Sequence, residues 1–209
     1  MKIHLILISL LISLSISAND WEFMHKKDGI KVYRKNIEGS PIVGFRGETV
    51  IYSQPEKVLA VLMDNVYRTE WVDRLEKSEI LERISPREYI VYQVFKLPWP
   101  LSKRDFVYKG KLIVDKKDKS ILVVMGSVEH PEAPKTVGVR AELITSRYRI
   151  KPLGKYMTGF EVEIHSDPKG LIPSFIVNLV QKSWPYKTLM SVKRQVEKPY
   201  VKPYPLPTN

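Results

Sequence analysis

Apolar residues recur with a period of two through the middle of the chain, which is the pattern of β-strands. The segment 89–97 shows the alternation best. Both of its alternating sets are largely apolar, so we expect this strand to be covered on both faces. Short polar turns separate successive runs and favour antiparallel pairing. The predicted strands are residues 30–34, 42–52, 80–84, 89–97, 106–114, 120–128, 137–150 and 156–164.

The helical period of apolar residues is confined to the two ends of the sequence. Near the N-terminus, residues 19–23 fit a short capped helix. Ser53 and Glu56 fit a capping box that opens a helix ending at Asp64. The second short helix predicted after it carries Tyr67 and Trp71.

A long helix is predicted at the C-terminal end, from Pro173 to about Lys198. Proline suits the first turn of a helix, whereas Pro185, inside the helix, predicts a kink. The first two turns are apolar almost all round, so this helix should be buried on more than one side. The last residues, 199–209, hold four prolines and are expected to be extended and poorly ordered.

This order of elements predicts an α+β fold, in which successive antiparallel strands are flanked by helices at the ends of the sequence. The long helix would pack on one face of a strongly curved sheet and leave an enclosed space between the two. No repeat or linker interrupts the pattern, so residues 19–198 are interpreted as one domain.

The N-terminal residues 1–18 have the pattern of a signal peptide. Lys2 precedes an apolar run, residues 3–16, and small residues lead to Ala18, where cleavage is expected. As a helix this run covers about 21 Å, less than the roughly 30 Å of a membrane's hydrocarbon core. We therefore expect a cleaved signal and a periplasmic or secreted protein.

Charge and composition narrow the range of partners. The chain has 34 Lys and Arg residues against 23 Asp and Glu, a formal net charge of +11, and no cysteine. A basic excess either confers solubility or indicates an anionic partner. Because export argues against nucleic acid, we expect transient contact of a monomer with an anionic membrane surface. The lack of cysteine excludes disulfides and thiolate chemistry.

No arrangement of residues in the sequence indicates catalysis, a metal or a cofactor. The sequence has neither a nucleophile elbow nor a phosphate-binding loop. Arg104 and Asp105 are interpreted as members of structural ion pairs at strand ends. The histidines lack metal-ligand spacing. They are His4, His25, His130 and His165.

Five segments of the chain resemble the motifs of one protein family. The segment 97–107 is similar to the family's "PWPxxxRDFV" motif, and 139–142 is similar to its "VRAE" strand. Residues 167–173, followed by Asn178, resemble the "DPKGxIP…N" sequence that leads into its last helix. The segments that fit its first two strands are 29–33 and 45–48.

The family that these motifs resemble is START, the steroidogenic acute regulatory protein-related lipid-transfer domains. The resemblance covers essentially the whole mature chain. It implies a helix-grip fold, in which a curved antiparallel sheet is wrapped around a long C-terminal helix. It also implies a hydrophobic tunnel for one lipid, sterol or similar ligand, with no catalysed reaction. Residues 97–102 would form a loop at the tunnel mouth and act with the last helix as a gate.

The candidate ligand-binding residues combine this resemblance with the predicted strands. Sterol-binding members often carry an acid and an arginine in the cavity, but Gly110 stands where we align that arginine. We therefore expect other residues to supply the polar groups of the cavity, and the identity of the ligand stays open. Trp99, in the loop at the mouth, is either a gate residue or a buried core aromatic. The polar candidates are Tyr92, Gln93, Arg140 and Tyr148. The other candidates are Trp71, Trp99, Phe160, Ile176, Val180 and Trp184.

Two alternatives to a lipid carrier stay open at this point. Related helix-grip domains include polyketide cyclases, so an enzyme is one alternative. A cyclase would need a positioned acid or base in the cavity, and the sequence offers none that we can name. The other alternative is a sensor whose bound ligand alters a protein contact, and only the proline-rich tail favours it.

Overall fold

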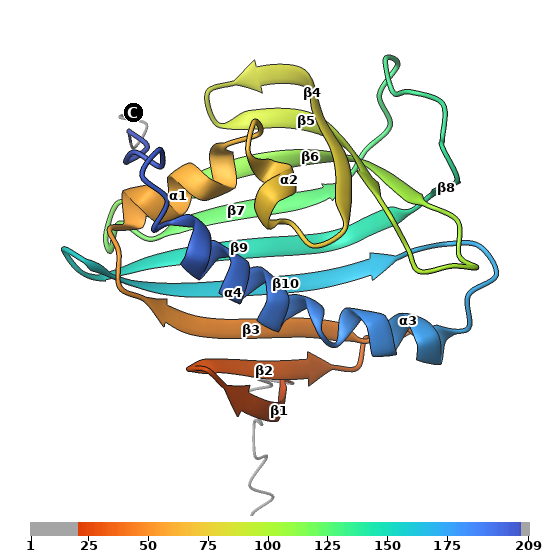
Figure 1. Cartoon of the computed structure of the whole chain (residues 1–209), viewed down its shortest axis with the longest axis horizontal. Coiled ribbons are helices and arrows are strands. Elements are labelled where there is room, and N and C mark those ends of the chain that lie inside the picture. Colours follow the sequence, from red (N-terminus) through yellow and green to blue (C-terminus); the bar gives the residue numbers. More distant parts are fainter. Residues whose placement is uncertain (1–20, 206–209) are drawn as a thin grey trace, which may run out of the picture.

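The structure is a computed structural model, and it describes residues 21–205. Within this part of the chain, one curved sheet has the strand order β1-β2-β3-β10-β9-β7-β6-β5-β4 (Figure 1). Neighbours on this path are antiparallel, and β8 adds a short parallel pairing to β6. The strands are β1 (Glu22–Lys27), β2 (Ile30–Lys35), β3 (Gly44–Ile51), β4 (Leu75–Ser85), β5 (Glu88–Phe95), β6 (Arg104–Val114), β7 (Ile121–Ser127), β8 (Val139–Arg140), β9 (Glu142–Gly154) and β10 (Met157–Asp167).

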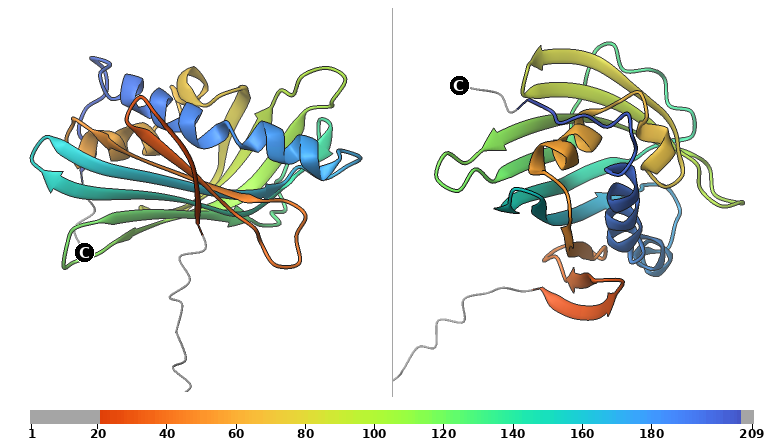
Figure 2. Two further views of the ribbon diagram at one scale, coloured as in Figure 1. Left: turned by 90° about the horizontal axis from the view of Figure 1, so that it is seen from below. Right: turned by 60° about the vertical axis from the view of Figure 1, so that its left-hand side comes forward.

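The helices of the described region lie on one face of the sheet (Figures 1 and 2). None of them is long and apolar enough to span a membrane. The central element of this layer is α4, which contacts β2, β3 and β10. The helices are α1 (Pro55–Met63), α2 (Arg68–Trp71), α3 (Ser174–Gln181) and α4 (Trp184–Gln195).

The sheet grips α4 at close range. Leu189 and Val192 of α4 are fully buried against it. Gly47 of β3 permits this approach, because a Cβ atom there would lie 2.8 Å from both Leu189 Cδ1 and Pro185 Cβ. The predicted α+β helix-grip fold, a curved antiparallel sheet around the C-terminal helical segment, is confirmed.

The predicted long helix is broken in two rather than kinked. α3 ends at Gln181, and α4 begins at Trp184. Pro185 explains the break, since it lacks the N–H that would bond to the Gln181 carbonyl and its ring would clash with that carbonyl. The proline thus locates the interruption correctly. α4 also ends at Gln195, earlier than the predicted Lys198.

Two local predictions near the N-terminal side of the domain are wrong. Residues 19–23 are predicted as helix, but β1 begins at Glu22 and pairs with β2, and residues 19 and 20 lie outside the described part. Gln54, not Ser53, is the N-cap of α1, and no side chain caps that end. The Ser53 carbonyl instead accepts a hydrogen bond from Thr158 Oγ1 at 2.8 Å. In both places long-range pairing overrides a local capping signal.

The proline-rich tail also differs from the expectation of poor order. Up to residue 205 it packs against α1 and α2. Tyr200 stacks on Tyr67 with ring centroids 4.2 Å apart, and Val201 is buried in the main core. The backbone N–H of Tyr204 donates to the Glu56 carbonyl at 3.0 Å. The segment begins with a turn, in which the Val201 N–H donates to the Lys198 carbonyl at 3.1 Å, and its apolar side chains find partners that composition alone does not reveal.

The prediction that β5 is covered on both faces is confirmed. Its inner face joins the main core, and residues Tyr89 to Val94 are all buried. On the outer face, the loop of residues 128–138 folds over the strand and forms a separate apolar cluster. The cluster consists of Ile90, Tyr92, Val94 and Val107, with Leu81, Val128 and Ala133 packed against it.

Asp105, near the start of β6, fixes this covering loop. Its carboxylate is fully buried. It accepts hydrogen bonds from Tyr92 Oη at 3.1 Å, Thr136 Oγ1 at 3.1 Å and Arg140 Nε at 2.7 Å. The backbone N–H of Val137 also donates to it, at 3.2 Å. Asp105 is thus in an ion pair, as predicted, but its partner is Arg140 and the pair lies on the outer face of the sheet, whereas Arg104 is in no ion pair with any described residue.

Candidate ligand-binding cavity

A cavity lies between the inner face of the sheet and the helical segment α3–α4. Its outer compartment has a volume of about 390 Å³, and its wall includes Leu97, Pro98 and Leu101 as well as the cavity-facing side of α3. An inner compartment of about 80 Å³ continues beneath Trp184 toward α2. The residues common to both walls are Phe95, Phe106, Ile164, Ser166 and Trp184. The two compartments are mostly apolar and adjoin each other at these shared side chains.

The inner compartment ends at a buried cation. Arg68 of α2 is 6% exposed, and its guanidinium lies over the Trp71 ring, 5.9 Å from the centroid. It donates hydrogen bonds to the carbonyls of Leu62 and Asp64. Among the described residues, no carboxylate lies within 4 Å of its nitrogens. A buried charge without a counter-ion is costly, so this position favours an anionic or strongly dipolar ligand group.

Polar side chains surround this end of the cavity. Burial raises the pKa of Tyr148 to about 12 and raises the pKa of Tyr108 as well, while the positive charge of Arg68 opposes both shifts. Both phenols are therefore neutral hydrogen-bonding groups at physiological pH. Gln93 lies in the same wall and donates to Ser78 Oγ at 3.0 Å. The arrangement offers a ligand a cation and neutral polar groups in an otherwise apolar space.

The mouth of the cavity is held by a second buried arginine. Arg104 donates from Nε to the Pro168 carbonyl at 2.7 Å, from Nη1 to the Ser102 carbonyl at 2.5 Å and from Nη2 to the Lys169 carbonyl at 3.2 Å. Burial lowers the pKa of Arg104. Its partners are carbonyls, not the carboxylate expected from the sequence. Arg104 thus connects the loop before β6 with the loop before α3.

Few contacts hold α3 over the mouth. Val177 is the only residue of this helix that is buried. Two side-chain amides tether the helix: Asn178 Oδ1 accepts from the Val43 N–H at 2.9 Å, and Gln181 Nε2 donates to the Ser166 carbonyl at 2.8 Å. A helix with so little buried apolar area is among the parts of a fold that open most easily.

The structure places most of the predicted site residues on the cavity wall. Four of them border the inner compartment, and two more border the outer one. Phe160 lies in the core behind Tyr148, with ring centroids 6.2 Å apart, and does not reach the cavity. The predicted residues found on the inner wall are Trp71, Gln93, Tyr148 and Trp184, and the two more found on the outer wall are Ile176 and Val180.

Three predicted site residues lie elsewhere. Tyr92 and Arg140 belong to the cluster around Asp105 on the outer face of the sheet, because adjacent residues of a strand point to opposite faces. Trp99 is 93% exposed, so it is neither a buried core aromatic nor part of the cavity wall.

Sequence reasoning missed several residues of the cavity wall. Phe106 and Tyr108 alternate on one face of β6, so the period of two could have found them. Arg68 gave no such signal, because it lies on a helix of a single turn whose orientation depends on tertiary packing.

A substitution in α3 tests the outer wall. Val180 is 39% exposed and borders the outer compartment, so Val180→Asp should change the free energy of unfolding by no more than about 0.5 kcal/mol. A carboxylate in this wall must stay hydrated or become neutral, so uptake of a soluble fluorescent fatty acid should fall by at least about tenfold. Phe175→Asp, on the same helix but outside the wall, is the control and should leave uptake unchanged. A collapse of thermal stability in Val180→Asp would contradict this placement.

The fold and the cavity together define the class of protein. A curved antiparallel sheet that grips a C-terminal helical segment around one apolar cavity is a helix-grip ligand-binding domain. Within that class, the model of the START domain matches residues 11–195. The chain belongs to the START domain family.

Individual relatives agree with this assignment. The chain is 29% identical to the phosphatidylcholine transfer protein of Mus musculus over 174 residues, which cover 81% of this chain and 80% of that protein. The solved structure of the STAR-related lipid transfer protein from Xanthomonas axonopodis has a TM-score of 0.77 and 27% identity, covering 86% of this chain and 100% of the other. Human StAR-related lipid transfer protein 5 has a TM-score of 0.79 at 21% identity, covering 87% and 88%, and shows the fold alone.

Proposed function

We propose that this protein binds one phospholipid or similar lipid in its cavity and carries it between membranes without catalysing a reaction. The observation that carries this proposal is the combination of an apolar cavity with the unpaired cation of Arg68 at its inner end. The phosphate or carboxylate of a lipid would face Arg68. Its acyl chain would occupy the outer compartment, where each buried methylene contributes about 0.8 kcal/mol. Membership in the START family and the similarity to a phosphatidylcholine transfer protein support this assignment.

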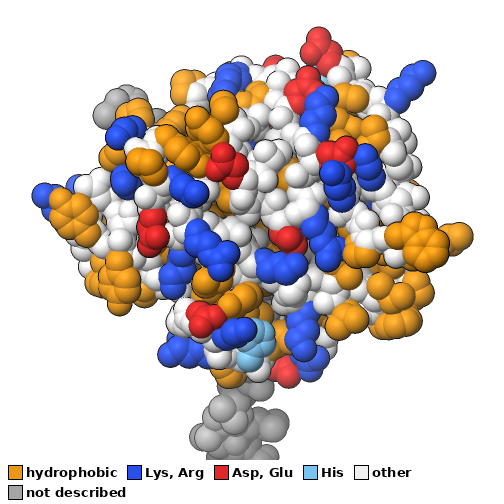
Figure 3. All heavy atoms as spheres, in the orientation of Figure 1, with side chains coloured by type: hydrophobic (Ala, Val, Ile, Leu, Met, Phe, Trp, Pro, Cys, Tyr) orange, Lys and Arg blue, Asp and Glu red, His pale blue; other side chains and the backbone are white. Residues whose placement is uncertain are grey.

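The proposed exchange of lipid takes place at a membrane surface. Large apolar side chains are exposed around the mouth and would enter the interfacial region of the bilayer. Figure 3 shows hydrophobic side chains gathered at the edge of the molecule where α3 lies. Lysines flank this patch and would face anionic headgroups. The exposed apolar residues are Trp99, Leu171, Phe175 and Leu179, and the lysines are Lys96, Lys103 and Lys182. Lys96 and Lys103 share the Glu76 carboxylate, at 3.9 and 2.7 Å, so the three lysines and this acid leave a net charge of +2.

Two features support a carrier over the alternatives. In the described residues, the wall of the inner compartment contains no Asp, Glu or His side chain that could act as the base of a cyclase, and the acid in the outer wall, Asp73, is paired with Lys187 at 2.8 Å. The proline-rich tail, which alone favoured a sensor, packs on α1 and α2. We further propose an exported monomer with no nucleic-acid partner. The signal peptide on which export rests, residues 1–18, lies outside the described part, and N-terminal sequencing that begins near Asn19 would support it.

Native mass spectrometry of the protein from its own organism, with lipid extraction, tests the proposed function. We expect one lipid per chain and transfer of phosphatidylcholine between vesicles. Leu171→Ser with Phe175→Ser, which are exposed and lie outside the cavity wall, should slow this transfer by about tenfold or more, while uptake of a soluble lipid is preserved. A chain that neither holds a lipid nor takes one up from vesicles would refute the proposal.

A further inference from the structure

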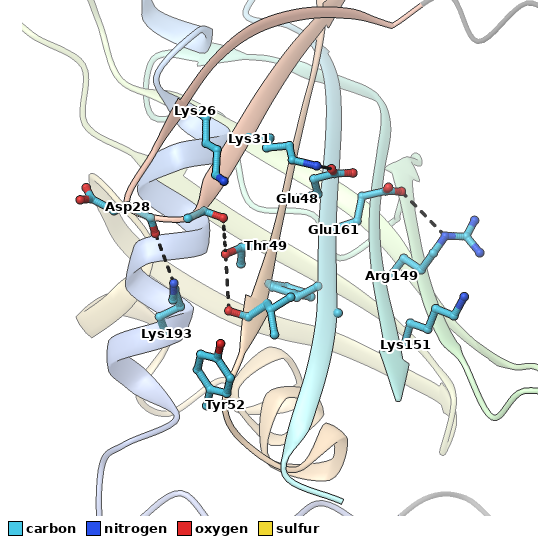
Figure 4. A pocket seen from close by; sticks show the side chains of 14 residues that line it. Lys26, Asp28, Lys31, Glu48, Thr49, Tyr52, Arg149, Lys151, Glu161 and Lys193 are labelled. Carbon is cyan, nitrogen blue, oxygen red and sulfur yellow. Dashed lines mark hydrogen bonds and ion pairs between the residues drawn. The ribbon is translucent and has the colours of Figure 1, made fainter. Parts of the chain in front are cut away.

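A groove lined by charged side chains lies at the end of the molecule opposite the mouth. It has a volume of about 680 Å³ and is formed by the β1–β2 hairpin, the ends of β3, β9 and β10, and the last turns of α4. Figure 4 shows Lys26 and Lys193 on one side of it and Lys151 on the other. Its cationic side chains are Lys26, Lys31, Arg149, Lys151 and Lys193, and its acidic ones are Asp28, Glu48 and Glu161.

The acids of the groove are already engaged. Lys31 Nζ pairs with Glu48 Oε1 at 3.0 Å, and Arg149 Nε lies 3.8 Å from Glu161 Oε1. The Asp28 carboxylate accepts a hydrogen bond from the Tyr186 hydroxyl at 2.5 Å. Three cations have no carboxylate partner among the described residues, and with the charge of Asp28 counted the five cations and three acids give the groove a net charge of +2. In the described part of the chain, Lys26, Lys151 and Lys193 have no carboxylate within 4 Å, and Lys193 donates only to the Asp28 carbonyl, at 3.4 Å.

The turns around the groove extend this positive surface. The antiparallel register brings the β1–β2, β6–β7 and β9–β10 turns to the same end of the sheet (Figure 1). The carboxylates of Asp115 and Asp118 accept backbone N–H groups within their own turn. Apolar and aromatic side chains are exposed between these turns. The additional lysines are Lys27, Lys116, Lys117, Lys119 and Lys155, and the exposed apolar residues are Tyr52, Leu153 and Tyr156.

We propose that this end is a second docking surface, for a membrane that carries anionic lipids, with lipid phosphates in the groove between Lys26, Lys151 and Lys193. Exposed tyrosines with lysines suit the headgroup region of a bilayer, where an aromatic ring and its hydroxyl meet both environments. The cations project from several separate turns at one end. They match an extended anionic surface better than a single linear polyanion.

The two ends can act on different membranes. Along β10, Gly159 of the groove and Ser166 of the mouth cavity are seven residues apart, so the two sites lie roughly 23 Å apart. This separation exceeds the Debye length of about 8 Å at physiological ionic strength, so each end responds to its own surface. The protein would then bridge two membranes while lipid exchanges at the mouth. The bridging role rests on the proposed mouth contact, whereas binding at the groove does not.

Clustering of vesicles, followed by light scattering, tests this inference. We expect the full chain to cluster vesicles of phosphatidylcholine with phosphatidylglycerol, but not of phosphatidylcholine alone, and high salt should disperse the clusters. The variant with Lys26→Gln, Lys151→Gln and Lys193→Gln should lose clustering yet keep one lipid per chain. A second comparison uses the variant Leu171→Ser with Phe175→Ser, which lacks the mouth contact. Adding the three groove changes to this variant should weaken its binding to vesicles by about a hundredfold. The matched control, Lys77→Gln with Lys109→Gln and Lys135→Gln, removes equal charge outside the groove.

Each contrary outcome has a distinct meaning. Equal loss in the control would assign the effect to net charge and overturn the inference. Unchanged clustering in the groove variant, or no clustering by the unmodified protein, would overturn it too. Retention on heparin without binding to anionic vesicles would point to a polyanion instead of a membrane and also reject it. Vesicle binding at the groove by a protein that takes up no lipid would leave this inference standing while refuting the proposed function.

Discussion

Asp105→Ala is expected to lower the free energy of unfolding by about 3–5 kcal/mol, because it leaves the partners of a buried carboxylate unpaired. The change removes the acceptor for Tyr92 and Thr136 and the ion-pair partner of Arg140 at once. The Arg140 side chain is 36% exposed, so solvent can rehydrate part of its charge and keep the loss near the lower figure. Denaturation with urea, followed by tryptophan fluorescence, measures the effect.

The matched control for this prediction is Glu76→Ala. Glu76 pairs with Lys103 at 2.7 Å on the surface, and exposed pairs contribute at most about 1 kcal/mol. Because Asp105 lies on the outer face of the sheet, its loss should leave ligand uptake unchanged at temperatures where the variant is folded. A loss of stability no greater than that of Glu76→Ala would show that the loop of residues 128–138 is held by its apolar contacts alone.

The fold was predictable from the sequence because its main features are local and periodic. Alternation over residues 89–97 indicated a strand that is covered on both faces, and Pro185 located the break in the last helix. The errors arose where tertiary contacts decide. β1 gains a strand partner across the turn at Gly29, and the tail finds a place for Val201 in the core. Neither contact leaves a periodic signal in its own segment.

The site was less predictable than the fold for a related reason. The period of two separates Tyr92 from Gln93 but does not say which of them faces the cavity, since both are buried. A covering loop makes the outer face of β5 as apolar as the inner one. Arg68 could not be predicted for a different reason. It lies on a helix of one turn, and the neighbouring residues in the sequence do not show that the Arg68 guanidinium closes a cavity formed by distant strands.

Replacement of Arg68 by methionine is expected to change lipid binding and stability in opposite directions. The unpaired guanidinium is costly in the empty protein, so its removal should leave the melting temperature unchanged or raise it, despite the loss of two carbonyl contacts. A hydrogen bond to a charged group contributes about 1.5–3 kcal/mol. Affinity for phosphatidylcholine or phosphatidylglycerol should therefore fall by about 10- to 100-fold, while affinity for a neutral diacylglycerol should not fall.

Arg68→Lys and Arg83→Met separate the role of the cation from general effects of charge. Lysine keeps the charge but not the planar set of donors, so Arg68→Lys should retain part of the preference for phosphate-bearing lipids. Arg83 is exposed at the far end of β4, and its removal changes the net charge equally without touching the cavity. Calorimetric melting and competition between phospholipid and diacylglycerol on the same variants give both quantities. If Arg68→Met lowers stability sharply and weakens both lipids alike, Arg68 serves to hold α2 in place and does not select the headgroup.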